Sequence, residues 1–323
     1  MCFDIWLARN GAVAIRFPEA PTAVELRDAV VRLVLTTIAF MILYYDFGLT
    51  FGVEVERFWE GRRLNALSCG FFLSRYMSLV GHVPVMYEFY GAPSIHVWVL
   101  YGTVILKSAS TGAYLHRCHS LQTFHQLLSG FAQVTVAALQ IFRVYAIYNS
   151  SRRILYALIG LCLTSFGVAM WAIVVSWHLG SDTSPRVVGL RESGKQIGCN
   201  LGQSKGQGHY VAIIWGSFLA FDAIVFAMTI SRIRGLGQTM RGGVFSVILR
   251  DGTLYFTILL GFHLANILTA LLERPALRSI SVTATNILAT TLMSRLMLNI
   301  RDPALLHNLC LNGLSEVLYN SQM

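Results

Sequence analysis

Five ionisable residues lie inside long apolar stretches of this sequence, where a charge is costly and usually has a partner or a function. They are Asp46, Arg75, Asp222, His263 and Arg295. These residue types allow two kinds of chemistry. A carboxylate can pair with a guanidinium on a neighbouring helix, and a group of polar side chains can line a cavity for a ligand or an ion.

The depth of each residue in its stretch narrows the choice of partners. Asp46 and Arg295 each lie about one helical turn from the same end of the first and last stretches, so we expect an ion pair between them, with Arg75 as the substitute partner. Asp222 lies near the middle of its stretch. His263 and Asn266 share one helix face and are its expected neighbours. These three residues either line a cavity or join the helices.

Motifs for other kinds of chemistry are missing. All three lysines lie between the apolar stretches, so no stretch carries a lysine for a retinal Schiff base. We find no phosphate-binding glycine loop, no G-x-S-x-G and no H-E-x-x-H. His116, His119 and His125 cluster together but have no acidic residue close by in the sequence. We therefore predict no catalytic residue, no cofactor and no metal site.

Seven apolar stretches position these residues. Each reaches or approaches the roughly 20 residues that a helix needs to cross a bilayer. They are 29–51, 65–86, 122–148, 154–177, 209–231, 253–272 and 279–299. Hydrophobic residues make up 55% of the chain and charged residues 13%, against about a quarter charged in soluble domains. The mean hydropathy is +0.58. We predict an all-α fold, a polytopic membrane protein with a bundle of seven transmembrane helices.

The basic residues predict an orientation. With seven spans the termini lie on opposite faces, and the arginines close to helix ends favour an extracytosolic N-terminus and a cytosolic C-terminus. The net charge of +9 is scattered over short loops, so the expected partner is the lipid bilayer and not nucleic acid. The membrane is the plasma membrane or another endomembrane.

The expected organisation has three parts. Residues 1–28 form an extracytosolic segment, residues 29–299 the transmembrane domain, and residues 300–323 a cytosolic tail. Within the domain, residues 91–117 hold an apolar run too short to span a bilayer. We interpret this segment as a loop that is an insertion, a re-entrant segment or a gene-model error.

Two cysteines face the same side in this topology. Cys118 precedes the third span, and Cys199 lies between the fourth and fifth. Both are expected on the extracytosolic side, where thiols oxidise, so we predict a Cys118–Cys199 disulfide.

Several strings in the sequence are distinctive as a set. They are LYYD at 43–46, LT at 49–50, EVE at 54–56, FW at 58–59, FLSRY at 72–76, PVMYEF at 84–89, FRVYAIY at 142–148, RR at 152–153, RDGTLYF at 250–256 and SRLMLNIR at 294–301. Together they resemble a fungal, mostly basidiomycete, family of membrane proteins named after an N-terminal domain of unknown function, number 6533. The resemblance implies seven helices, with the signature in the first two spans, 29–86. It implies no established activity.

A second resemblance is architectural. Arg143 and the Cys118/Cys199 pair are placed as in seven-helix G-protein-coupled receptors, although Phe142 stands where that motif has an acid. An arginine that anchors the helix at the cytosolic face fits Arg143 as well. We expect a receptor-like seven-span protein for an unidentified small molecule. A small-solute transporter or channel is the alternative, followed by a membrane-embedded enzyme.

Overall fold

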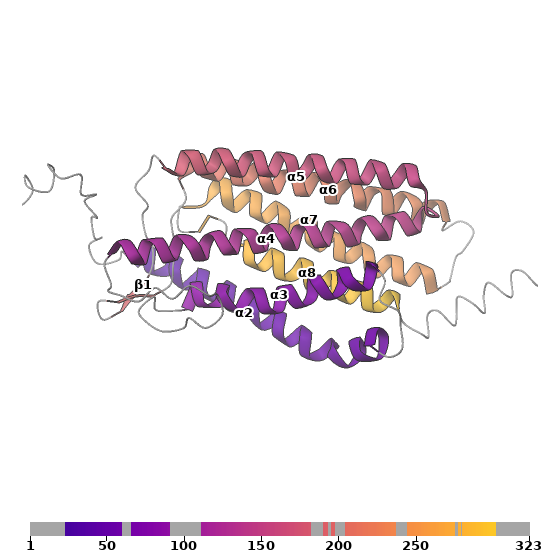
Figure 1. Cartoon of the computed structure of the whole chain (residues 1–323), viewed down its shortest axis with the longest axis horizontal. Coiled ribbons are helices and arrows are strands. Elements are labelled where there is room, and N and C mark those ends of the chain that lie inside the picture. The colour runs from indigo at the N-terminus through magenta and orange to yellow at the C-terminus, as the bar shows by residue number, and fades with distance from the viewer. Residues whose placement is uncertain are drawn as a thin grey trace, which may run out of the picture.

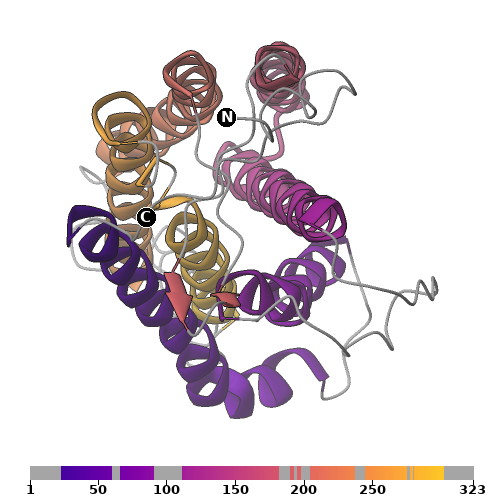
Figure 2. The ribbon, with the colours of Figure 1, turned by 90° about the vertical axis from the view of Figure 1, so that its left-hand side faces the viewer.

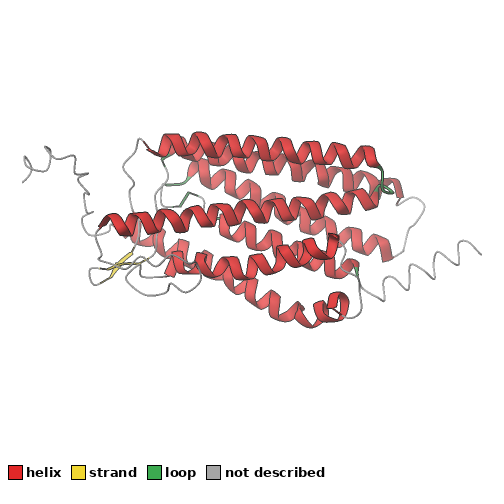
Figure 3. Cartoon of the chain, in the orientation of Figure 1, coloured by secondary structure: helices red, strands yellow, loops and turns green. Residues whose placement is uncertain are grey.

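The computed structural model describes residues 23–59, 66–90, 111–181, 190–192, 195–197, 204–236, 244–274, 277–278 and 280–301. Within them the chain forms seven long α-helices (Figures 1 and 3). These are α2 (Ala23–Glu54), α3 (Ala66–Tyr90), α4 (Thr111–Ile147), α5 (Arg152–Ser181), α6 (Lys205–Leu236), α7 (Val244–Leu272) and α8 (Val282–Ile300). A π-helical turn, η1 (Val55–Trp59), continues α2, and β1 (Leu190–Glu192) pairs antiparallel with β2 (Lys195–Ile197).

Each expected apolar stretch corresponds to one helix, but several helices begin earlier than expected. α2 begins at Ala23, inside the segment 1–28, and α7 begins at Val244. α4 begins at Thr111, so the last part of the segment 91–117 is helical and not a loop; residues 91–110 lie outside the described residues. The reason is that backbone hydrogen bonds continue a helix beyond the apolar residues that a bilayer would cover.

Four helices have spans that are long and apolar enough to cross a membrane. The spans are Cys118–Ile147, Arg152–Ser176, Lys205–Arg232 and Thr253–Leu272. Large apolar side chains also point outward, among them Met41 on α2, Leu163 on α5 and Leu254 on α7. An outer surface of this kind is covered by lipid in a helical membrane protein. The chain is therefore a multi-pass, all-α membrane protein.

Successive helices alternate in direction, so the bundle has two ends. The "Glu54 end" holds the ends of α2, α4, α6 and α8, and the "Cys118 end" lies opposite (Figure 1). Seen end-on, α8 lies among the other helices and packs against α2, α3, α4 and α7 (Figure 2). Although it carries Thr285, Asn286, Thr290 and Ser294, these side chains are buried. Its enclosed position allows a polar helix inside the bundle.

The remaining helices form the other side of the bundle. α5 packs on α6 and α6 on α7, and α4 lies between this α5–α6–α7 side and the α2–α3–α8 side. The share of buried residues in the most apolar stretch is 61% in α4 but 22–28% in α5, α6 and α7. α5, α6 and α7 thus expose more of their apolar stretches than α4 does.

The connection between α4 and α5 is a tight turn of residues 148–151. Asn149 and Ser150 have φ angles of 53° and 57°, in the left-handed region. The Ser150 N–H donates to the Tyr145 carbonyl at 3.0 Å, and the Asn149 N–H donates to the Ala146 carbonyl at 3.2 Å. This is the Schellman pattern, which satisfies the last carbonyls of a helix as the chain reverses.

Candidate functional site

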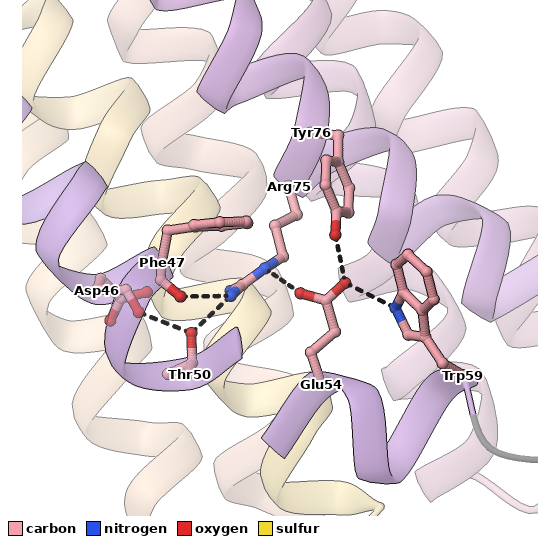
Figure 4. Close-up of polar contacts among 7 residues, drawn as sticks. All are labelled: Asp46, Phe47, Thr50, Glu54, Trp59, Arg75 and Tyr76. Atoms are coloured by element: carbon pink, nitrogen blue, oxygen red, sulfur yellow. Dashed lines mark hydrogen bonds and ion pairs between the residues drawn. The ribbon is translucent and has the colours of Figure 1, made fainter. Parts of the chain in front are cut away.

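A buried cluster of polar residues joins α2, η1 and α3 near the Glu54 end (Figure 4). At its centre the Glu54 side chain is 0% exposed, and its Oε2 lies 2.7 Å from Arg75 Nε. The other carboxylate oxygen accepts hydrogen bonds from the Tyr76 hydroxyl at 2.8 Å and from the Trp59 indole N–H at 3.1 Å. A carboxylate buried this completely is stable only with such partners.

Arg75 also ties the cluster to the middle of α2. Its NH2 donates to the Thr50 hydroxyl at 2.6 Å and to the Phe47 carbonyl at 3.3 Å. The Phe47 ring lies 4.8 Å from the guanidinium carbon, within the range of a cation–π interaction. The Thr50 hydroxyl in turn donates to the Asp46 carbonyl at 2.7 Å. Arg75 therefore bridges α3 and α2 over about two helical turns.

The local structure explains how these side chains meet. Asp46, Thr50 and Glu54 are spaced four residues apart, so they lie on one face of α2. The π-helical turn that follows relates each residue to the fifth one along the chain, and Trp59 is the fifth residue after Glu54. The widened turn thus brings the Trp59 indole back to the Glu54 carboxylate.

A second ion pair connects this cluster to the central helix. Arg295 on α8 donates through Nε to Asp46 Oδ1, and the Arg295 side chain is 44% exposed. A small cavity beside the pair, lined in part by Arg75, Ser78 and Thr290, has space for about one water molecule. Two carboxylates and two guanidiniums are therefore balanced within α2, α3 and α8. This arrangement can hold three helices together.

The partner of Arg75 was missed in the sequence. The structure brings Asp46 and Arg295 together and gives Arg75 to Glu54, not to Asp46. Glu54 follows the apolar run 29–51, and for that reason it was not counted among the intramembrane residues. Its spacing of eight residues from Asp46 is the signal that places both on one face.

On the α5–α6–α7 side, Asp222 and His263 are in contact. His263 Nε2 lies 2.8 Å from Asp222 Oδ2, between α7 and α6. Asn266 has other partners: its amide donates to the Thr285 hydroxyl at 2.7 Å, and its Oδ1 accepts from the Ser281 hydroxyl at 2.7 Å. His263 and Asn266 are not among the residues that line the cavity beside Asp222. Asp222 does line a water-sized cavity, but with side chains of α4 and α5.

Further polar contacts on α8 lie toward the Cys118 end. His125 has no acidic residue close by in the sequence, yet its Nδ1 lies 3.1 Å from Glu88 Oε2 and its Nε2 lies 3.2 Å from the Thr283 hydroxyl. Sequence distance hides this pair, because Glu88 is on α3 and His125 on α4. No group of three or more possible metal ligands of the His, Cys, Asp and Glu types occurs in the described part of the chain.

Arg143 on α4 is a buried cation near the Glu54 end. It is 6% exposed, and neither NH1 nor NH2 has a hydrogen-bond partner among the described residues. The Phe256 ring on α7 lies 5.1 Å from its guanidinium carbon. One turn earlier on α4, Gln140 is 0% exposed, and neither amide atom has a partner in the described ranges. Unsatisfied buried groups of this kind are costly and need an explanation.

The predicted disulfide is described at one of its two residues. Cys118 is buried and disulfide-bonded. Cys199 lies outside the described residues, so its pairing with Cys118 stays a prediction. Cys69 and Cys162 are free thiols.

The comparisons with known proteins concern the α2–α3 region. Residues 34–80 match the model of a family described as "Family of unknown function (DUF6533)". No curated protein and no solved structure matches the chain. The matched residues include Asp46, Glu54, Trp59, Arg75 and Tyr76, which form the cluster of Figure 4. The segment 34–80 therefore carries a DUF6533 domain, and the buried ion-pair cluster lies within it.

Proposed function

We propose that the chain is a seven-span, receptor-like membrane protein whose Glu54 end faces the cytosol. The seven-span topology adds α2, α3 and α8 to the four apolar spans. α2 exposes Val34, Ile38 and Met41, and α3 exposes Val80 and Val83, as lipid-facing helices do. α8 is enclosed by its neighbours, which makes its polar residues compatible with a membrane-spanning position.

Two independent features support the orientation. Arginines gather at the helix ends of the Glu54 end, as the positive-inside rule requires of a cytosolic face. They are Arg57, Arg152, Arg153, Arg232, Arg234 and Arg301. Cys118, at the opposite end, is disulfide-bonded, and disulfides form on the oxidising side of a membrane.

Glycosylation tests this orientation. Asn149 begins the sequence Asn149-Ser150-Ser151 and lies at the Glu54 end, so it should carry no glycan in cells. The change Arg191→Asn creates the acceptor Asn-Glu-Ser between α5 and α6, and this variant should be glycosylated. The measurement is the gel mobility before and after glycosidase treatment. A glycan on Asn149 in the native chain would reverse the orientation.

The buried Arg143, whose terminal nitrogens have no hydrogen-bond partner among the described residues, is the observation that carries the receptor-like function. A buried guanidinium whose two terminal nitrogens have no hydrogen-bond partner among the described residues raises the free energy of the state described here. A second arrangement of the helices in which Arg143 gains a partner is then close in free energy. A ligand that binds one of the two arrangements more tightly would shift the populations, which is how a receptor responds.

Distance measurements in nanodiscs test for the two arrangements. Spin labels at Tyr156→Cys on α5 and Leu254→Cys on α7 occupy exposed positions, in a background that keeps Cys118 and Cys199 and replaces the other native cysteines by serine. We expect two distances in the native background. Arg143→Met should leave one distance and raise the unfolding midpoint, because the variant no longer buries this charge. Arg152→Met, an exposed arginine at the same end, is the control and should change neither. A single distance in the native background, together with an unchanged unfolding midpoint in Arg143→Met, would contradict the proposal.

A small-solute transporter or channel is the second candidate. Buried polar side chains follow α8 from Thr283 near the Cys118 end to Ser294 near the Glu54 end, as in a solute path. Flux of labelled solutes into proteoliposomes distinguishes this candidate from a receptor. Uptake above that of empty liposomes would favour transport.

A further inference from the structure

We propose that the cavity beside Asp222 is a binding site for one small monovalent cation of the sodium type. The cavity lies between α4, α5 and α6, and its polar lining comes from Asp222, Gln133 and Ser165. Its volume of about 10 Å³ is enough for about one particle of the size of a water molecule. The site lies on another part of the bundle from Arg143 and does not depend on the receptor-like function.

The first step concerns the charge of His263, the ion-pair partner of Asp222. The imidazole is 1% exposed, and its Nε2 faces the Asp222 carboxylate. Its Nδ1 is buried and has no hydrogen-bond partner in the described part of the chain. An imidazolium would carry an unsatisfied N–H at Nδ1, whereas the neutral Nε2–H tautomer leaves only a lone pair there. The contact therefore favours a neutral His263 that donates one hydrogen bond.

The second step concerns the charge of Asp222. The residue is 5% exposed, and no arginine or lysine among the described residues forms an ion pair with it. With a neutral His263 as its partner, an ionised Asp222 has no counter-ion among the described residues, and such a charge inside the bundle is strongly unfavourable. Asp46 differs, because Arg295 already neutralises it. A cation in the adjacent cavity would supply the missing charge at Asp222.

The third step concerns the type of cation. The polar atoms around the cavity include oxygen donors that hard cations prefer: the Asp222 carboxylate, the Ser165 hydroxyl and the Gln133 amide oxygen. The Gln133 amide nitrogen donates to Asn286 Oδ1 at 3.0 Å, which leaves its oxygen as the acceptor. A single carboxylate balances one positive charge. A calcium site would usually hold several carboxylates and six to eight oxygens.

The test uses the purified full chain in phosphatidylcholine nanodiscs. Binding of ²²Na⁺ is measured, together with the unfolding midpoint in sodium chloride and in choline chloride at equal ionic strength. We expect about one bound sodium ion per chain and a midpoint that rises with sodium until it saturates, since only the folded chain has the site. Equal unfolding midpoints in the two salts, together with no sodium binding, would overturn the proposal. This is the result expected if His263 is an imidazolium, because Asp222 would then already have a counter-ion.

Variants locate the site. Asp222→Asn should abolish sodium binding, and Ser165→Ala should raise the dissociation constant about tenfold, the equivalent of one lost ligand of about 1.4 kcal/mol. Thr164→Ala removes the neighbouring hydroxyl, which bonds to the Leu161 carbonyl of its own helix, and should leave binding unchanged. If Asp222→Asn does not fold, a comparison of the sodium affinities of Ser165→Ala and Thr164→Ala still tests the site. Equal affinities in these two variants would overturn the assignment.

Discussion

On the α2–α3–α8 side of the bundle, the carboxylates of Asp46 and Glu54 each face a guanidinium, whereas on the α5–α6–α7 side the carboxylate of Asp222 faces an imidazole. The apolar stretches of α5, α6 and α7 are mostly exposed. The first side therefore depends on fixed charges that neutralise each other. The second side depends on close apolar packing, and Asp222 has no guanidinium partner among the described residues.

The largest expected effect breaks the Glu54–Arg75 pair. Either Glu54→Gln or Arg75→Met should lower the free energy of unfolding by about 3–5 kcal/mol, because each leaves the other partner charged and buried. The double variant should lose clearly less than the sum of the two. Unfolding in a denaturing detergent, followed by tryptophan fluorescence, gives these values. Glu56→Gln, an exposed glutamate two residues away, is the control and should have little effect.

A smaller effect is expected from packing on the α5–α6–α7 side. A Cβ atom at Gly208 on α6 would lie 2.5 Å from the Ala270 carbonyl oxygen on α7, so Gly208→Ala must push the two backbones apart. We expect a loss of about 1–3 kcal/mol in the same unfolding measurement. Gly216→Ala on the same helix meets no atom within 4 Å and should be neutral or slightly stabilising. Equal effects of the two changes would show that the close approach is not required.

The smallest effect is expected for Asp46 and Arg295. The Arg295 side chain is 44% exposed, and its ion pair is therefore partly screened and contributes about 1 kcal/mol. Asp46→Asn or Arg295→Met alone should lower the folded yield more than the double change, because each single change leaves one charge without its partner. Fluorescence-detected size-exclusion chromatography measures this yield. If both single variants fold normally, the pair does not stabilise the bundle.

The sequence predicted the elements better than their contacts. Apolar runs located every helix, because a membrane span must be apolar over most of its length. They did not locate the helix starts at Thr111 and Val244, since polar residues outside the bilayer also form helix. The position of Asp46 and Arg295 within their apolar stretches was enough to predict that they meet. Both residues lie at the same level of two helices that pack side by side.

Contacts that depend on helix rotation or on neighbours far apart in the sequence were not predictable. Glu54 lies beyond the apolar run, and a π-helical turn sets the direction of Trp59. Glu88 and His125 meet only because α3 and α4 pack together. The rotation of each helix about its axis is set by packing in three dimensions, and a single sequence gives no direct measure of it.

The tight turn between α4 and α5 has a consequence for the biogenesis of the protein. Only residues 148–151 separate two helices that are each apolar enough to cross the bilayer. A link of this length cannot leave one helix in the membrane and the other in water, so α4 and α5 must enter the membrane as one hairpin. Their relative depth in the bilayer is then fixed by the turn itself.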